Sequence, residues 1–243
     1  MAARRRLVVV GGDAAGMSAA TQARRRRSED ELDIVCFERG QYTSYAACGI
    51  PFFVGDLVPD ASDLVARSPE EHRRRGLDVR VGHDVVAIDT AHATVRVRDL
   101  AKESETDEPF DQLVVATGAT PVRPPIPGID ARGIFGVQSL ADGIAVRAAV
   151  DSGDARRAVV VGGGYIGLEL AEAMVLRGLD VALVEGAAQP MSTLDPDMGA
   201  LIADALRAVG VSLHLDAMVE TFHRVSRQPV AIALGTHANK QGR

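Results

Sequence analysis

One cysteine, Cys48, lies in a short segment whose residue types suit thiol chemistry. The segment reads Ser-Tyr-Ala-Ala-Cys-Gly-Ile-Pro from Ser44 to Pro51, so small residues flank the sulfur. If a helix begins here, its dipole favours the reactive thiolate; a small buried core thiol is the alternative interpretation. The other cysteine, Cys36, lies in the apolar run 33–37 and is predicted to pack in a core. Redox chemistry would therefore use Cys48 alone, through a mixed disulfide or a sulfenic acid.

The clearest binding motif follows the apolar run 158–161. Gly162, Gly164 and Gly167 stand in GxGxxG register. Such glycines permit a tight turn, close approach of a pyrophosphate and close helix packing, and the helix N-terminus that follows favours anions. Glu185 ends the next apolar run, where a carboxylate binds a ribose 2′-hydroxyl and repels a 2′-phosphate. The pattern predicts a dinucleotide site that favours NADH over NADPH.

A similar but imperfect motif occurs near the start of the chain. Gly11, Gly12 and Gly16 follow an apolar run, and Glu38 ends the next one. Asp13 stands where the middle glycine is expected, so its charge would lie close to a pyrophosphate. An α/β unit that binds no nucleotide is the alternative, but the second copy of the motif favours a second nucleotide site.

The elements that position these motifs follow from runs of apolar residues bounded by glycine and proline. Strands are predicted at 7–10, 33–37, 113–116, 158–161, 180–184 and 211–215, with a meander at 77–81, 84–88 and 93–97. Helices are predicted at 17–23, 168–177 and 196–209, a surface loop at 102–108 and a stiff connector at 121–128. The repeated strand–turn–helix–strand order predicts an α/β fold with two Rossmann-like, doubly wound βαβ domains.

Composition narrows the class of protein. The 243 residues are 47% hydrophobic and 25% charged, with a net charge of −6, which gives no reason to expect a nucleic-acid partner. The arginine runs 4–6, 24–27 and 73–75 are interpreted as solvated faces or helix ends. No apolar run is long enough for a signal peptide or a membrane span. We therefore expect a cytoplasmic protein with neither a membrane partner nor a metal site.

Taken together, these motifs resemble the pyridine nucleotide-disulfide oxidoreductases. The resemblance rests on the first glycine loop, the segment around Cys48, Ala-Thr-Gly-Ala at 116–119 with two following prolines, and Gly-Gly-Gly-Tyr-Ile-Gly-Leu-Glu at 162–169. It is closest to the single-cysteine branch with coenzyme A-disulfide reductase, NADH oxidase and NADH peroxidase. It covers most of residues 7–219 and implies a glutathione-reductase-like fold. Ala14 stands where the peroxidase carries a histidine, which favours a reductase or an oxidase.

The resemblance implies a role for each matching residue. FAD would bind the first loop, NADH (with NADPH possible) the second, and Cys48 would be the catalytic redox residue facing the flavin. The residues implied to bind the cofactors are Gly11, Gly12, Ala14, Ala15, Gly16, Glu38, Arg39, Ser44, Val85, Ala116, Thr117, Gly118, Gly162, Gly164, Tyr165, Ile166, Gly167 and Glu185. The implied substrate is a small disulfide such as coenzyme A disulfide.

The resemblance also implies a domain plan. Residues 1–120 would be the first part of an FAD-binding domain, 121–155 a connector, 156–218 a partial NAD(P)H-binding domain, and 219–243 a remnant similar to the second FAD-binding segment. We expect the chain to be internally deleted near 216–219 and cut short, without the dimerisation domain of its homodimeric relatives. Two alternatives stay open: an NADH oxidase with a sulfenic-acid cysteine, and a non-catalytic nucleotide-binding remnant.

Overall fold

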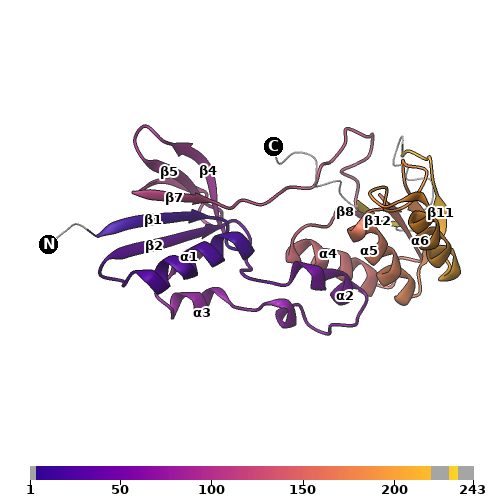
Figure 1. The fold of residues 1–243 in the computed structure, drawn as a ribbon, viewed down its shortest axis with the longest axis horizontal. Coiled ribbons are helices and arrows are strands. Elements are labelled where there is room, and N and C mark those ends of the chain that lie inside the picture. The colour runs from indigo at the N-terminus through magenta and orange to yellow at the C-terminus, as the bar shows by residue number, and fades with distance from the viewer. Residues whose placement is uncertain (1–3, 220–229, 235–243) are drawn as a thin grey trace. The chain divides into compact units, whose positions relative to one another are not determined.

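The computed structural model describes residues 4–219 and 230–234. The chain divides into two compact units (Figure 1). The first unit comprises residues 1–46 and 64–118, and the second comprises residues 47–63 and 119–243. No helix in the described ranges is long and apolar enough to cross a membrane. Because this division follows packing alone, the cofactor roles predicted for residues 1–120 and 156–218 stay predictions.

A four-stranded parallel sheet forms the centre of the first unit. Its order is β3-β2-β1-β7, and its strands are β1 Arg5–Val10, β2 Leu32–Glu38, β3 Asp78–Val81 and β7 Gln112–Val115. Helix α1, Ala14–Arg26, connects β1 to β2, and the short α3, Pro69–Arg73, precedes β3. The continuous apolar runs in β1 and β2 reflect burial on both faces, as parallel strands require.

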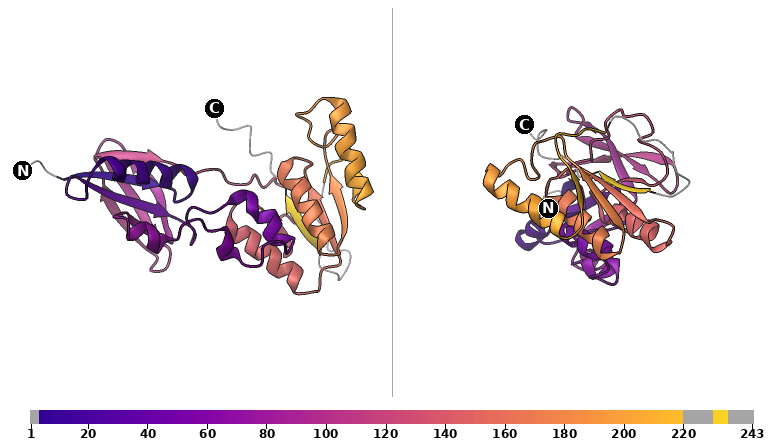
Figure 2. Two further views of the ribbon diagram at one scale, coloured as in Figure 1. Left: turned by 60° about the horizontal axis from the view of Figure 1, so that its bottom comes forward. Right: turned by 90° about the vertical axis from the view of Figure 1, so that its right-hand side faces the viewer.

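Alternate residues of β1 supply two separate cores. Leu7 and Val9 pack with Met17 and Ala20 of α1 on one face, whereas Val8 and Val10 pack against the opposite layer. This opposite layer is an antiparallel meander with strands β4 His83–Asp89, β5 Thr94–Asp99 and β6 Ser104–Pro109. The first unit therefore has three layers, with α1 and the meander on opposite faces of the parallel sheet (Figure 2).

Two expectations for this region were wrong. Residues 77–81 were expected in the meander, but β3 pairs in parallel with β2 at the edge of the first sheet. Residues 102–108 were expected to form a loop, but β6 pairs with β5 along its whole length. The sequence of β6 is polar throughout, so it lacks the alternation that marks a strand. What marks β6 as a strand is its pairing of opposite charges with β5: Arg96–Asp107 at 3.0 Å and Arg98–Glu105 at 2.6 Å.

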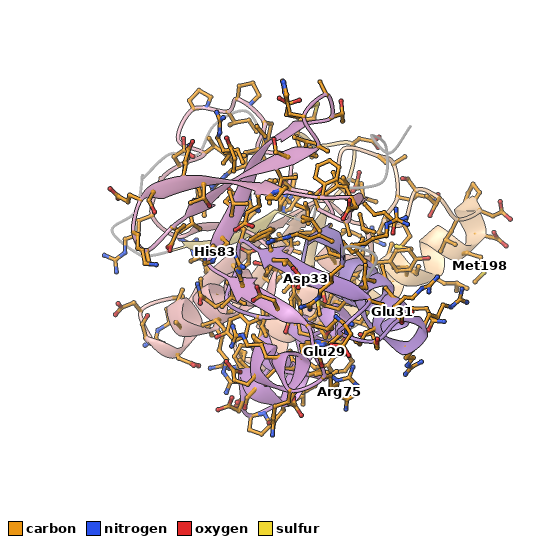
Figure 3. The ribbon with its side chains drawn as sticks, turned by 90° about the vertical axis from the view of Figure 1, so that its left-hand side faces the viewer. Glu29, Glu31, Asp33, Arg75, His83 and Met198 are labelled. Carbon is orange, nitrogen blue, oxygen red and sulfur yellow. The ribbon has the colours of Figure 1, made fainter. Side chains whose placement is uncertain are left out.

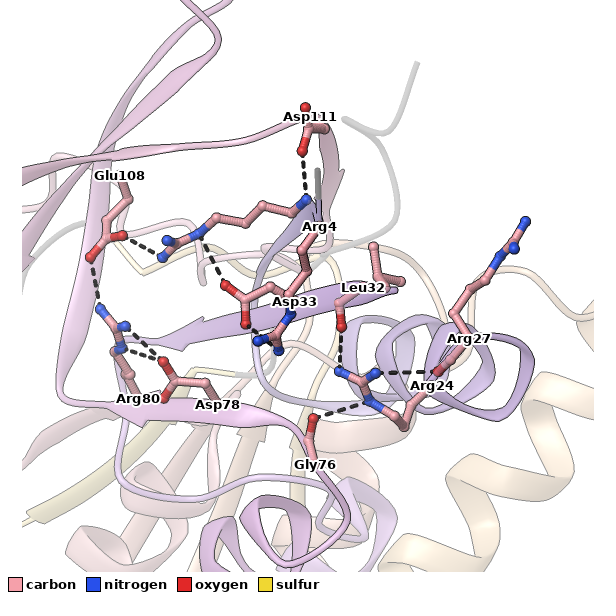
Figure 4. A network of polar contacts seen from close by, with 11 residues as sticks. Arg4, Arg24, Arg27, Leu32, Asp33, Gly76, Asp78, Arg80, Glu108 and Asp111 are labelled. Atoms are coloured by element: carbon pink, nitrogen blue, oxygen red, sulfur yellow. Dashed lines mark hydrogen bonds and ion pairs between the residues drawn. The ribbon is translucent and has the colours of Figure 1, made fainter. Parts of the chain in front are cut away.

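Charged side chains connect the layers of the first unit (Figure 4). Glu108 of β6 accepts hydrogen bonds from Arg6 of β1 at 2.6 Å and from Arg80 of β3 at 2.7 Å. Arg24, at the end of α1, donates to the carbonyl oxygens of Leu32 and Gly76. The arginine run 24–27 is therefore not wholly a solvated face, because Arg24 closes the helix end onto the sheet. Near the start of β2, Glu31 and Asp33 (Figure 3) form surface ion pairs with Arg27 at 3.3 Å and with Arg4 at 3.4 Å.

A five-stranded parallel sheet forms the second unit, with the order β11-β10-β9-β12-β8. Its strands are β8 Ile134–Gly136, β9 Arg157–Val161, β10 Asp180–Val184, β11 Ser212–His214 and β12 Val230–Leu234. Its main helices are α4 Leu140–Asp151, α5 Tyr165–Leu176 and α6 Pro196–Ala208. The predicted α/β class is confirmed. Of the proposed remnant at 219–243, only Val219 and β12 lie within the described residues, and β12 pairs between β9 and β8.

The segment that carries Cys48 belongs to the second unit. A 3₁₀ turn, Ala47–Gly49, leads into helix α2, Ile50–Val54, which packs against α4 and α5. A Cβ on Gly143 of α4 would lie 2.6 Å from Ile50, so only glycine permits this approach.

Two arginines anchor the end of α2. Arg147 donates to the carbonyl oxygens of Phe53 and Val58, each at 2.8 Å, and its guanidinium lies 4.5 Å from the centre of the Phe53 ring. Arg177 donates to the carbonyl oxygen of Val54 at 3.0 Å. Cations stabilise exposed carbonyl groups at a helix C-terminus, so these side chains position the Cys48 segment.

Replacing Arg147 tests this anchor. Arg147→Met keeps the apolar stem but leaves two carbonyl oxygens without their charged donor, so we expect a loss of about 2–3 kcal/mol in the free energy of unfolding. Urea unfolding followed by circular dichroism measures it, with the exposed Arg132→Ala as the control. A loss no larger than that of the control would contradict the anchoring role.

Candidate functional site: two glycine loops and a cysteine segment

The first loop depends on close backbone approaches. Gly11 has a φ of +107°, and a Cβ at this position would lie 2.1 Å from the carbonyl oxygen of Ala116. A Cβ on Gly16 would lie 1.9 Å from the carbonyl oxygen of Gly11. Only glycine fits both places. The result is that α1 begins directly at the end of β1, with Ala116 beside it.

The second loop repeats this geometry. Gly162 has a φ of +102°, and a Cβ on Gly167 would lie 2.0 Å from the carbonyl oxygen of Gly162. The N–H of Gly162 donates to the carbonyl oxygen of Val184 at 2.8 Å, as that of Gly11 does to Phe37. The two loops are therefore the same structure built twice.

Each loop is also tied to the acid that ends the next strand. Glu38 accepts a hydrogen bond from the N–H of Gly12 at 2.6 Å, and Glu185 accepts one from the N–H of Gly163 at 2.6 Å. A Cβ on Gly12 would lie 2.7 Å from the Cβ of Glu38. Both carboxylates thus lie beside a phosphate-type loop, where an acid can bind a ribose.

The helix N-termini at both loops fit a dinucleotide phosphate, although not equally. Gly164, the N-cap of α5, forms no side-chain cap, and a Cβ there would have nothing within 4 Å. Asp13, the N-cap of α1, also forms no side-chain capping hydrogen bond, and its Oδ1 atom is buried without a partner among the described residues. Burial raises the pKa of Asp13 above its usual value, and the nearby Glu38 adds to this shift. Open N–H groups at both helices suit an anion, but at the first an acid is adjacent.

The other residues implied to bind the cofactors lie in several different parts of the structure. Thr117 follows Ala116 beside Gly11, and Ser44 donates its N–H to the carbonyl oxygen of Gly12 at 3.2 Å. Val85 packs against the core under the meander, at a register irregularity of β4. The remaining implied residues are Ala14 and Ala15 in the first turn of α1, Tyr165 and Ile166 in the first turn of α5, Gly118 with a φ of +67°, and the exposed Arg39. Their cofactor roles stay predictions.

The two cysteines differ as their positions in the sequence suggest. Cys36 is fully buried in β2. Its burial, together with the nearby Asp78, raises the pKa of this thiol to about 12. Cys48 is exposed, so the alternative of a small buried core thiol is wrong for it. Cys48 lies in the second unit, whereas the first loop lies in the first unit.

An open cavity of about 600 Å³ lies in the first unit, against α1. Its lining mixes polar and apolar surface and includes two arginines, and the lining residues are Asp13, Ala14, Met17, Ser18, Thr21, Gln22, Arg25, Ser44, Tyr45, Arg67 and His72. A short antiparallel bridge between Tyr45 and Val65 holds the segment next to residues 64–67, where Thr43 donates to the carbonyl oxygen of Arg67 at 3.1 Å. The lining suits a ligand that carries negative charge.

Sequence reasoning missed several residues of this cavity. Neither His72 nor Arg67 was singled out from the sequence. These residues come from segments more than twenty positions from Ser44, so no local spacing marks them. Gly163 was also missed as a partner of Glu185, although the matching second glycine at Gly12 was a visible signal.

The chain matches the family model of the pyridine nucleotide-disulphide oxidoreductases over residues 5–241. It belongs to this family. It is 36% identical over 193 residues to an NADH oxidase of Enterococcus faecalis, covering 79% of this chain and 43% of that protein. It is 32% identical over 179 residues to a coenzyme A disulfide reductase of Staphylococcus haemolyticus, covering 73% and 40%. The chain thus spans about two-fifths of the length of these relatives.

Solved structures of the family agree with this assignment. The reduced CoADR-RHD of Bacillus anthracis matches with a TM-score of 0.90 and 32% identity, covering 96% of this chain and 44% of that one. The water-forming NADH oxidase of Lactobacillus brevis, bound to NADH, matches with a TM-score of 0.88 and 33% identity, covering 95% and 53%. The predicted family and its Rossmann-like fold are confirmed.

A pair of glycine substitutions separates packing from open space in the second loop. In Gly167→Ala the new Cβ meets a backbone carbonyl, so we expect a loss of at least about 2 kcal/mol in unfolding free energy. In Gly164→Ala the Cβ enters empty space, so the loss should be only the usual cost of alanine at an N-cap, below about 1 kcal/mol. Thermal and urea unfolding of both variants measure this, and equal losses would contradict the close approach at Gly167.

The thiols should react at very different rates in the folded protein. We expect iodoacetamide at pH 8 to alkylate Cys48 within minutes and to leave Cys36 unmodified, because Cys36 is buried and its thiol pKa is raised. Mass spectrometry after tryptic digestion identifies the modified residue. Denatured protein, in which both cysteines react, is the control, and labelling of Cys36 in the folded state would disprove the assignment.

Proposed function

We propose that this chain is the nucleotide-binding part of a flavin-dependent NAD(P)H:disulfide oxidoreductase that uses Cys48 as its single redox cysteine. The observation that carries the proposal is the twice-built glycine loop, each copy tied to an acid, with an exposed cysteine in the segment between them. In this proposal FAD binds the first loop and NADH the second. When bound, FAD would accept a hydride from NADH and supply two electrons to the cysteine.

The residues of this chain would carry the thiol half of the reaction. The Cys48 thiolate attacks a disulfide RSSR, forms a mixed disulfide with one half and releases the other as a thiolate. Two electrons and a proton then reduce the mixed disulfide, which returns the Cys48 thiolate and releases a second thiol. No second cysteine is needed, which agrees with the buried, core position of Cys36.

The cavity against α1, with its two arginines, supports coenzyme A disulfide as the substrate. Arg25 and Arg67 in its lining suit phosphate groups, and Ser18 and Thr21 offer hydroxyl groups. Tyr45, which lines the cavity, precedes Cys48 by three residues in the sequence.

The choice of NADH rests on Glu185. Its carboxylate is held beside the second loop by the N–H groups of Gly163 and Ala187. A 2′-phosphate would be placed next to this negative charge, which costs binding energy. The similar proteins include an NADH oxidase as well as a coenzyme A disulfide reductase, so oxygen is the second candidate acceptor, with Cys48 cycling through a sulfenic acid.

Turnover experiments separate these candidates. We expect stoichiometric flavin in the visible spectrum, anaerobic NADH oxidation with coenzyme A disulfide, and a loss of at least about a hundredfold in this rate for Cys48→Ser, since the variant lacks the nucleophile. Cys36→Ala is the matched control and should retain the rate.

The outcomes of these experiments distinguish the reductase, the oxidase and the non-catalytic remnant. NADH consumption with oxygen alone, and none with coenzyme A disulfide, would favour the oxidase. Unchanged turnover in Cys48→Ser would disprove the thiol mechanism for either acceptor. A folded protein that binds flavin or NADH but turns over neither acceptor would leave the non-catalytic nucleotide-binding remnant as the better description.

A further inference from the structure

Ser44 and His72 form a hydrogen-bonded pair in the lining of the α1 cavity. The Ser44 Oγ and His72 Nε2 atoms are 3.0 Å apart. Ser44 itself is held in the left-handed region with a φ of +48°, and its carbonyl oxygen accepts a hydrogen bond from the N–H of Ala66 at 2.9 Å. For a residue other than glycine such a backbone conformation is uncommon and is held by its surroundings. The loop therefore presents the Ser44 hydroxyl at a fixed place.

The burial of His72 limits how the pair can share its protons. The His72 side chain is 1% exposed, and its Nδ1 atom has no hydrogen-bond partner among the described residues. A buried N–H without a partner is rarer in proteins than a buried acceptor without one. The tautomer with the proton on Nε2 is therefore favoured, because it leaves Nδ1 as an acceptor. In this tautomer Nε2–H donates to the Ser44 oxygen, and the hydroxyl proton of Ser44 is free to point elsewhere.

The surroundings keep this imidazole neutral. Burial, together with the positive charges of Arg67 and Arg75, lowers the pKa of His72 to about 4, although Glu71 opposes the shift. Asp13 and Arg25 are the other charged groups in the cavity lining. At neutral pH the histidine is thus a fixed hydrogen-bond donor and does not add a third positive charge to the cavity.

We propose that His72 is a positioning residue that holds the Ser44 hydroxyl as a hydrogen-bond donor toward an anionic, phosphate-type group of the ligand in the α1 cavity. In the cavity, Arg25 and Arg67 supply positive charge, whereas the Ser44 hydroxyl supplies a hydrogen bond in a fixed direction. The proposal rests on the function proposed above, since it takes the cavity to be the substrate site. The added residue is His72, which would act on the ligand only through the side chain of Ser44.

A double-mutant cycle on binding tests this role. The probe is coenzyme A, titrated by calorimetry into the whole chain. We expect His72→Phe to weaken binding roughly five- to tenfold, the effect of one hydrogen bond. Ser44→Ala should weaken it by a similar factor, and the double variant by no more than Ser44→Ala alone. His72→Gln, whose amide N–H replaces Nε2–H, should restore binding to within about twofold.

The tautomer provides a readout that a merely structural role would not move. In ¹⁵N NMR spectra of the histidine side chains we expect His72 to be neutral with its proton on Nε2 at pH 7. A proton on Nδ1, additive losses in the cycle, or full affinity in His72→Phe would overturn the role of His72 and leave the proposed function standing. A folded wild-type chain that does not bind coenzyme A would instead overturn the proposed substrate and, with it, the ligand contact of Ser44.

Discussion

The close approach of a backbone carbonyl to a glycine is the constraint on which both halves of this protein depend. At Gly16 and at Gly167 there is no room for a side-chain carbon, because a carbonyl oxygen from the start of the same loop lies where it would stand. This contact fixes how each helix leaves its strand. It therefore also fixes where the unpaired N–H groups of the helix point and which loop glycine meets the acid of the next strand. The remainder of each site is built around that turn.

The functional groups outside the loops are positioned by different means. Ser44 and Arg67 meet through a short antiparallel bridge, not through a regular element. Cys48 lies in the 3₁₀ turn that leads into α2, a helix of only five residues, which by itself would be marginal. Its order comes from α4 and α5, and in particular from arginines that bind the carbonyl oxygens at its end. The glycine turns therefore position the two loops, and the arginines Arg147 and Arg177 position the Cys48 segment.

Much of the fold and part of the site could be predicted from the sequence, and the reason differs from residue to residue. The apolar runs of β1 and β9, the glycine spacing and the acids at 38 and 185 are local signals, so the two loops were found with their partners. The polar strand β6 was missed because its stability comes from arginines on β5, which no pattern within β6 reveals. His72 and Arg147 were missed for the same physical reason: each acts on a segment distant in sequence, and only the folded chain brings the partners together.

The packing of residues 47–63 with the second unit has a consequence for how the molecule is made. On the ribosome, the apolar residues Ile50, Phe53 and Val54 emerge about ninety residues before Arg147, which completes their environment. Until then the nascent first half carries a short apolar segment with no surface to cover it, which is the kind of exposed segment that chaperones bind. The same discontinuity means that a protein cut at residue 118 yields no self-sufficient second half. Division of this chain into separately expressed domains would have to move α2 to the other piece.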